Sequence, residues 1–150
     1  MILTLDVFLK MPLPGAYTAM TFMAKHISIS IDCPAAQVYA FVSNPANLPR
    51  WAAGLSGSIQ HINDEWIAES PMGRVKVKFT EKNTFGVLDH DVTLPSGLSV
   101  YNPMRVFPND SGSELIFTLY RRPDMSEQSF TEDARLVQRD LETLKALLEQ

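Results

Sequence analysis

The sequence contains a single cysteine, Cys33, so no disulfide can form within the chain. Proteins without disulfides are typical of reducing compartments, and we therefore expect a cytoplasmic location. No apolar run approaches the roughly 20 residues that a membrane-spanning helix needs, so no membrane span is predicted. Blocks of like charge are also absent, and the net charge is −4. This acidic balance argues against a nucleic-acid binder, because phosphate binding needs a positive surface.

Catalytic motifs are equally scarce. The chain has no glycine-rich phosphate loop, no recognisable Ser-His-Asp arrangement and no paired carboxylate motif. Its three histidines, His26, His61 and His90, fall on separate predicted strands without the spacing of a metal site. No metal, cofactor or catalytic residue is therefore predicted, and the residues alone leave open whether the protein is an enzyme.

What is present is the composition of one globular domain. The chain has 150 residues, of which 45% are apolar and 20% are charged, close to the averages for such domains. A domain of this length buries roughly 70% of the surface that its unfolded chain exposes, so it needs neither metal nor disulfide. We expect this single domain to cover residues 23–150.

Residues 1–22 form an apolar segment without regular periodicity. Its apolar residues are interrupted by Asp6, Lys10, Pro12 and Pro14. A secretory signal has positive charge ahead of an uninterrupted apolar stretch, and this segment does not fit that pattern. We interpret residues 1–22 as a loosely attached N-terminal extension.

Regular structure begins with a strand. Residues 25–32 alternate strictly, with Ile27, Ile29 and Ile31 on one face, which is typical of a half-buried strand. Two short helices follow, the first starting near Pro34 and the second within residues 47–51. Further short strands are predicted at residues 58–62, 65–69, 74–80, 87–94, 98–107 and 114–121. No helical pattern separates these later strands, so they should pair antiparallel.

The C-terminal residues give the strongest helical pattern. Ser126 is the expected N-cap, and a helix of roughly 23 residues would be about 35 Å long. Its apolar stripe comprises Phe130, Ala134, Val137, Leu141, Leu144 and Leu148. The outer face carries the pairs Glu132–Arg135, Arg139–Glu142 and Lys145–Glu149. The predicted fold class is therefore α+β, with a curved antiparallel sheet of about six or seven strands around one long helix.

This pattern resembles the START-like helix-grip (SRPBCC) superfamily, which includes pollen-allergen-type proteins, polyketide cyclases and dehydratases, and lipid-transfer domains. The resemblance covers about residues 24–150 and rests on DCPAAQVYAFVSNPANLPRW and on the terminal SFTEDARLVQRDLETLKALLEQ. The segments SPMGRVKVKF, LDHDVTLPSG and RRPDMSEQSF are similar to those of small bacterial polyketide cyclase/dehydrase-like proteins. The resemblance implies a deep cavity between the sheet and the long helix.

The expected function is binding of a small apolar or aromatic molecule in that cavity. A cyclase/dehydratase-type enzyme acting on a polyketide-like substrate and a protein-interaction module are the alternatives. The protein is expected to be a monomer or a homodimer.

Five residues are the candidate ligand contacts: His90, Asn102, Trp66, Tyr101 and Met104. His90 and Asn102 are each the strongly polar member of an otherwise apolar alternating face, and buried polar groups require partners. Trp51 and Trp66 are more often packing residues than ligand contacts. As ligand contacts, Trp66 would form the floor of the cavity and Trp51 its mouth. Tyr101 lies on the opposite face of its strand from Asn102 and Met104, unless a bulge at Pro103 swaps the two faces.

We predict that residues 1–22 are dispensable for folding. A chain that starts at Met23 should melt within a few degrees of the full chain, because the first strand begins only at Lys25. Thermal unfolding followed by circular dichroism measures this. A loss of about 10 °C would mean instead that the segment packs into the core.

Overall fold

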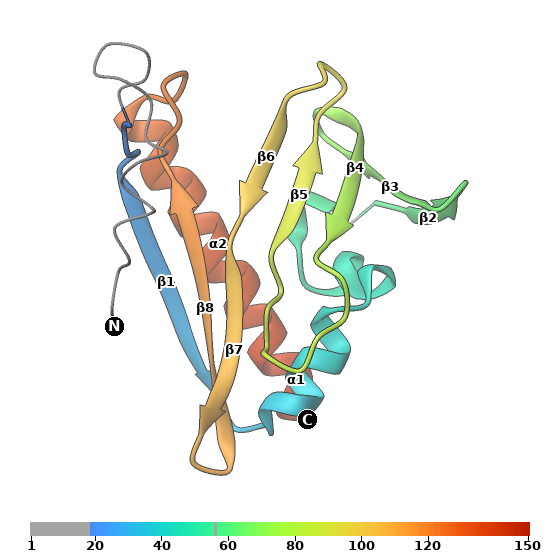
Figure 1. Cartoon of the computed structure of the whole chain (residues 1–150), viewed down its shortest axis with the longest axis vertical. Helices are drawn as coiled ribbons and strands as arrows, with labels where there is room; N and C mark the ends of the chain where they lie inside the picture. The colour runs from blue at the N-terminus through green and yellow to red at the C-terminus, as the bar shows by residue number, and fades with distance from the viewer. Residues whose placement is uncertain (1–18, 56) are drawn as a thin grey trace, which may run out of the picture.

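The strands pair into two antiparallel sheets in a computed structural model of the protein, which describes residues 19–55 and 57–150. The first sheet has the order β1-β8-β7, and the second has the order β2-β3-β4-β5-β6 (Figure 1). The strands are β1 (Ala24–Ile31), β2 (Ile59–Ile62), β3 (Glu65–Ser70), β4 (Gly73–Phe79), β5 (His90–Thr93), β6 (Ser99–Asn102), β7 (Met104–Asn109) and β8 (Gly112–Tyr120). The predicted α+β class and antiparallel pairing are confirmed.

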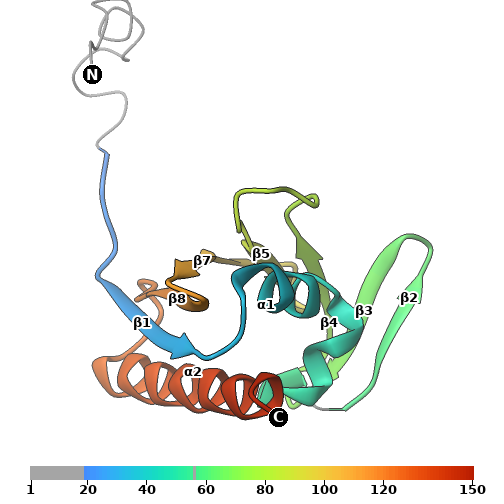
Figure 2. The same ribbon diagram turned by 90° about the horizontal axis from the view of Figure 1, so that it is seen from below.

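Two α-helices and two 3-10 helices complete the described chain. These are α1 (Ala35–Val42), η2 (Pro45–Arg50), η3 (Ala53–Leu55) and α2 (Glu127–Leu148). In Figure 2 the strands form an arch that begins at β1 on one side of α2 and ends at β2 and β3 on the other. In the same view helix α1 lies within the arch, and in Figure 1 it lies at the lower end of the molecule. The sequence predicted short helices in this part of the chain. Helix α1 starts one residue later than expected, because Pro34 is the N-cap rather than the first helical residue.

The pairing of β1 with β8 follows directly from alternation. Ile27 and Ile31 are buried on β1, while the serines between them face solvent. Ile27 pairs with Phe117 of β8, whose odd-numbered residues from Ser113 to Leu119 are all buried. Because both strands repeat with a period of two, their apolar faces meet on the same side of the sheet.

Turn residues fix the β2–β3 hairpin. Asn63 and Asp64 have φ angles of 50° and 61°, the left-handed values that a two-residue type I′ turn requires. The predicted hairpin is therefore confirmed.

One predicted strand was wrong in its extent. Residues 98–107 divide at Pro103 into β6, which pairs with β5, and β7, which pairs with β8. Proline has no N–H to continue the ladder, so the strand changes sheets there and an eighth strand results. The strand expected over residues 87–94 is also shorter: β5 begins at His90, and Val87 forms only an isolated bridge to Arg105.

Helix α2 begins where the sequence predicted. The Ser126 side chain accepts a hydrogen bond of 3.0 Å from the Ser129 amide. Phe130, Ala134, Leu141 and Leu144 of its stripe are buried. Two of the three predicted ion pairs form, Glu132–Arg135 and Lys145–Glu149. The third does not, because Glu142 instead accepts a hydrogen bond of 3.1 Å from Gln138.

The η2 segment contributes to the core of the domain. Trp51 is only 6% exposed and belongs with Leu48 to the same apolar cluster as Leu141 and Leu144 of α2. The interpretation of Trp51 as a packing residue is therefore confirmed, and Trp51 does not line the mouth of a cavity. Asp140 of α2 ties the neighbouring η3 in place by accepting a hydrogen bond of 3.1 Å from the Ala53 amide.

The predicted N-terminal extension is described only in part. Residues 1–18 lie outside the described residues, while residues 19–23 are exposed and precede β1. The dispensability of residues 1–22 stays a prediction. Among the described helices, none has the length and apolarity needed to cross a bilayer.

Removal of a buried leucine from α2 should strongly destabilise the domain. Leu144→Ala is expected to lower the free energy of unfolding by about 2–5 kcal/mol, because the fully buried side chain leaves a cavity. Arg135→Ala, on the exposed face of the same helix, should leave that free energy nearly unchanged. Urea denaturation measures both. Equal losses at the two positions would contradict the packing of α2 described above.

Candidate functional site

A cleft of about 780 Å³ opens between the α1–η2 corner and the β3–β4 hairpin. One wall comes from the end of α1 and the start of η2, where Ala40, Ser43 and Asn44 line it. The facing wall comes from β3, β4 and the residues that follow β4. The cleft is therefore built by the short helices and the five-stranded sheet.

Trp66 and Phe79 give the cleft its aromatic wall. Trp66 pairs in register with Val77, which is buried, so both lie on the inner face of the sheet together with Phe79. The Trp66 ring stacks on His61 of β2, with the ring centroids 4.7 Å apart. Trp66 is half-buried and lines the cleft, so part of its ring surface is available to a ligand.

His90 lies directly against Phe79. The two residues pair across β4 and β5, and their rings stack with centroids 4.7 Å apart and an interplanar angle of 26°. The Phe117 ring lies on a further side at 6.1 Å. His90 is only 8% exposed, so the prediction that it points inward is confirmed.

The protonation state of His90 follows from its surroundings. Burial lowers the pKa of the imidazole below its ordinary value of 6.5, although a hydrogen bond to the Leu88 carbonyl and the charge of Asp91 oppose this shift. Nδ1 lies 3.0 Å from the Leu88 carbonyl oxygen, which can only accept, so Nδ1 carries the proton of the neutral ring. Nε2 is then an acceptor, and it makes no hydrogen bond within residues 19–55 and 57–150.

Charged side chains form the rim of the cleft. Three lysines (Lys76, Lys78 and Lys82) and three carboxylates (Asp64, Glu65 and Glu81) line it. Lys76 pairs with Glu65 at 2.8 Å. Lys78 alternates with Val77 and Phe79 on β4, so its side chain is directed to the outer face. Within the described part of the chain, Lys82 of the loop after β4 forms no ion pair, so its ammonium group can meet an anionic group of a ligand.

The five predicted contacts do not all come together. Trp66 lines the cleft, and His90 lies behind Phe79. Asn102 pairs with His90 in register, is half-buried, and donates a hydrogen bond of 3.1 Å to the Val100 carbonyl. Met104 is completely buried in the core.

Tyr101 is directed to the other face of the sheet, where it is 49% exposed. Its hydroxyl donates a hydrogen bond of 2.7 Å to Asp89. The ligand-binding role of all five residues stays a prediction.

Sequence reasoning missed two residues of this region. Phe79 was not singled out as a site residue, although it ends the alternating apolar run of Val75, Val77 and Phe79. Asp89 was not singled out, yet its buried carboxylate contacts Tyr101, Arg105 and the Met104 amide. No local pattern marks Asp89, because its partners lie 12 or more residues away.

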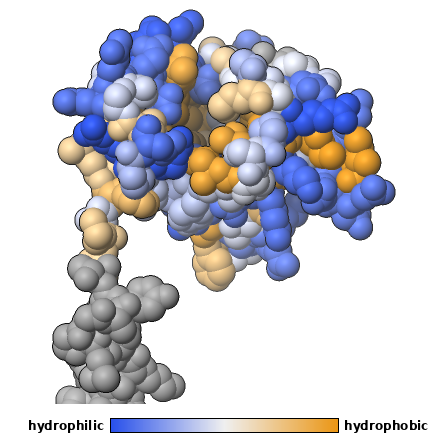
Figure 3. Space-filling view, turned by 90° about the horizontal axis from the view of Figure 1, so that it is seen from above, coloured by the Kyte–Doolittle hydropathy of each residue, from blue (hydrophilic) through white to orange (hydrophobic). Residues whose placement is uncertain are grey.

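The cleft also differs in place from the expected cavity between the sheet and the long helix. Its lining residues come from α1, η2 and the sheet and its loops, none from α2. The reason is packing, because Trp51 and Leu48 are buried in the same apolar cluster as the α2 stripe. At the other end of the arch, Val92, Val100 and Asn102 are only half-buried on the inner face. Figure 3 shows apolar residues in the middle of that end, between polar margins.

No group of three or more His, Cys, Asp or Glu side chains that could hold a metal ion occurs among the described residues. The lining of the cleft offers aromatic stacking, apolar contact and charged rim groups.

Comparison with known proteins identifies the family. Residues 26–149 match the family described as "Polyketide cyclase / dehydrase and lipid transport". The chain belongs to this family. No curated protein has a significant match to the sequence.

Solved structures share the fold at low sequence identity. The Aha1 dimer from Colwellia psychrerythraea matches with a TM-score of 0.68 at 13% identity, over 85% of this chain and 96% of that chain. The protein XoxI from Bacillus cereus matches with a TM-score of 0.64 at 12% identity, over 86% and 96%. Ara h 8.0201 matches with a TM-score of 0.58 at 14% identity, over 84% and 97%. These similarities confirm the helix-grip fold that the sequence predicted, and at such identities they show the fold alone.

Burial of neutral His90 should make stability depend on pH. The lowered pKa means that the unfolded chain takes up a proton at a higher pH than the folded chain. Above about pH 6.5, the ordinary pKa of a histidine, His90 therefore does not reduce the free energy of unfolding. As the pH falls below that value, the free energy of unfolding decreases. His90→Phe should remove this part of the pH dependence of the free energy of unfolding. The difference between the variant and the unchanged protein then isolates the effect of His90.

Urea denaturation between pH 5 and 8 measures the effect, with Asn102→Leu on the neighbouring strand as a non-titrating control. A slope that persists in His90→Phe would show that another group causes it.

Proposed function

We propose that the protein binds a small apolar or aromatic molecule in the cleft between α1–η2 and β3–β4. The observation that carries this proposal is the half-buried aromatic wall of Trp66 and Phe79 in a cleft of about 780 Å³. Sites for small molecules are typically concave, about 300–1,000 Å³, and lined by apolar and aromatic groups with a few polar ones. The family description, which includes polyketide cyclases and lipid transport, supports the same ligand class.

The arrangement favours a flat ligand with an acidic group. An aromatic ring of the ligand can pack on Trp66 or Phe79 at the inner wall, because offset-stacked and edge-to-face aromatic pairs are favourable. Lys82 at the rim can then pair with a carboxylate or phenolate. His90 and Asn102 lie one layer deeper, and we assign them to contact with a ligand that reaches past Phe79.

A cyclase/dehydratase-type reaction is the second candidate function. The observation that favours it is the neutral imidazole of His90, whose Nδ1 is fixed by the Leu88 carbonyl. Nε2 of such a ring can accept a proton from a substrate, which is the role of a general base. An enzyme of this kind would lose activity in His90→Phe and would show a pH–rate profile that follows the His90 pKa. A binding protein would show neither effect.

Binding can be tested with the fluorescent probe 1-anilinonaphthalene-8-sulfonate, which combines aromatic rings with an anionic group. Trp66→Ala should raise the dissociation constant of the probe about tenfold, equivalent to a loss of roughly 1.4 kcal/mol of binding free energy. Lys82→Gln should weaken probe binding to a similar extent at low salt, because the ion pair at the rim is screened by salt.

The matched control is Ile67→Ala, since Ile67 is the next residue on β3 and is directed to the opposite face. Circular dichroism melts confirm that each variant is folded. Equal affinity in Trp66→Ala and Ile67→Ala would contradict the proposed site. Native mass spectrometry of protein purified from its own host then identifies the retained molecule.

A further inference from the structure

The loop between β4 and β5 is held in one conformation by Asn83. The Asn83 side-chain oxygen accepts hydrogen bonds from the amides of Phe85 at 3.0 Å and Val87 at 3.1 Å. Its side-chain nitrogen donates to the carbonyls of Glu81 and Val87, each at 3.0 Å. Its amide donates at 2.8 Å to the Tyr39 hydroxyl of α1. The loop is thus fastened both to itself and to a helix.

Gly86 allows the same loop to lie close against β7. Its φ of +71° suits glycine, and a Cβ at this position would collide with the Val106 carbonyl oxygen. The Val106 amide donates to the Gly86 carbonyl at 2.9 Å, and the Leu88 amide donates to the Met104 carbonyl at 2.9 Å. The loop therefore extends the sheet beside β7.

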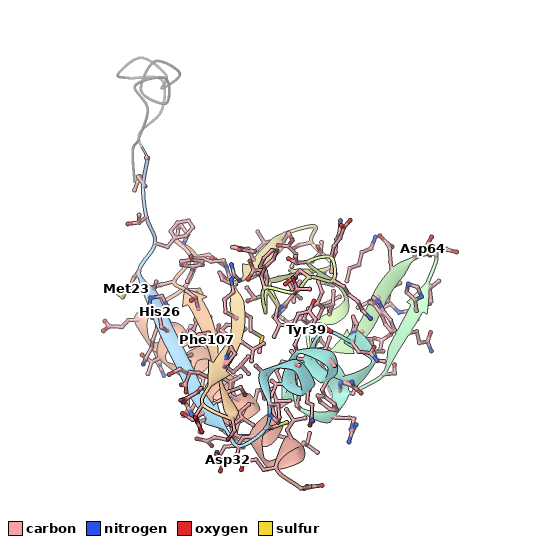
Figure 4. The ribbon with its side chains drawn as sticks, turned by 60° about the horizontal axis from the view of Figure 1, so that its bottom comes forward. Met23, His26, Asp32, Tyr39, Asp64 and Phe107 are labelled. Atoms are coloured by element: carbon pink, nitrogen blue, oxygen red, sulfur yellow. The ribbon has the colours of Figure 1, made fainter. Side chains whose placement is uncertain are left out.

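This fixed loop exposes an aromatic side chain. Phe85 is 82% exposed, and Phe107 on the adjacent strand is 44% exposed. Figure 4 shows Phe107 of β7 and Tyr39 of α1 on the same side of the molecule. Scattered apolar side chains are normal on protein surfaces, whereas a rigid loop that displays one beside a second indicates a contact site.

An uncharged groove of about 460 Å³ adjoins Phe85. Small residues, Ala35 and Ala36 of α1 together with Gly86, form part of it. The full lining is Ala35, Ala36, Tyr39, Asn83, Thr84, Phe85, Gly86, Val106, Phe107 and Pro108, which we call the Phe85 patch. None of these ten residues is charged, although 20% of the chain is. Interface cores are similarly depleted of charge and enriched in aromatic residues.

We propose that the Phe85 patch binds the same patch of a second copy of this chain. A two-fold interface brings one surface against itself, so it needs a projection and a recess on the same patch. Phe85 is the projection, and the groove beside Ala36 is the recess. Each Phe85 of the pair then enters the groove of its partner. Because the lining is uncharged, a two-fold contact of the patch with itself brings no like charges together, although the chain has a net charge of −4. The fixed loop loses little conformational freedom on binding. This inference is independent of the proposed ligand site.

Sedimentation equilibrium over a range of protein concentrations tests the proposal with two variants. Phe85→Ala removes the projection, and Ala36→Trp fills the recess at an exposed position of α1. Each variant alone should dissociate at least about tenfold more readily than the unchanged chain. Met72→Ala is the matched control, because Met72 is 65% exposed on the β3–β4 turn and lies outside the Phe85 patch. It should associate like the unchanged chain.

Mixing the two variants gives the decisive measurement. In a mixed pair, the Phe85 that is retained in the Ala36→Trp chain enters the groove that is retained in the Phe85→Ala chain. At the second contact, the filled groove of the Ala36→Trp chain faces the position where the Phe85→Ala chain lacks its ring, so the two chains do not clash. The mixture should therefore recover association that neither variant shows alone.

A monomeric unchanged chain at all concentrations would overturn the proposal, and so would undiminished association of Phe85→Ala. Failure of the mixture to recover would equally overturn the exchange of projections and point to another protein as the occupant. Probe binding at the Trp66 cleft can be measured in the same variants, so failure here is distinct from failure of the ligand proposal.

Discussion

The chain changes sheets at Pro103, and a buried carboxylate stabilises this change. Because proline cannot donate to a ladder, the strand that ends at Asn102 must break, and the amide of Met104 needs a new acceptor. The carboxylate of Asp89 accepts that amide at 2.8 Å and also contacts Tyr101 and Arg105. A buried carboxylate without such partners would be strongly unfavourable. The Pro103 break and the Asp89 contacts thus depend on each other.

The position of the cleft follows from this break. After it, β7 continues beside β8, while β6 stays with β5, so the two sheets diverge and the strands form an arch (Figure 2). Helix α2 lies along the arch and buries its stripe, and the η2 segment inserts Leu48 and Trp51 into the same core. Near η2 the space between helix and sheet is therefore occupied by side chains. Open volume is displaced to the flank of α1, where Trp66 is left half-buried.

Periodicity made the regular elements predictable, while long-range packing was not. The alternation of Ile27, Ile29 and Ile31 and the stripe of α2 each specify an element and its buried face within a local stretch. His90 could be placed inward for the same reason. The residues that bury Trp51 could not be predicted, because they depend on how η2 meets a helix nearly 90 residues later, through contacts such as that of Asp140 with Ala53. The sequence could predict Trp66 as an inward-facing aromatic residue of the cleft. It could not predict the opposite wall, which comes from α1 and η2.

The cleft and the Phe85 patch share the elements that build them. The loop after β4 lines the cleft with Thr80 to Lys82 and the patch with Asn83 to Gly86. Helix α1 likewise lines the cleft at Ala40 and the patch at Ala36. The hydrogen bond from the Asn83 amide to the Tyr39 hydroxyl joins these two elements within the Phe85 patch. A contact that restrains the loop after β4 therefore also restrains helix α1, and the reverse holds. Ligand binding and self-association at these sites would therefore act on the same loop and the same helix, and any coupling between them must pass in both directions with equal free energy.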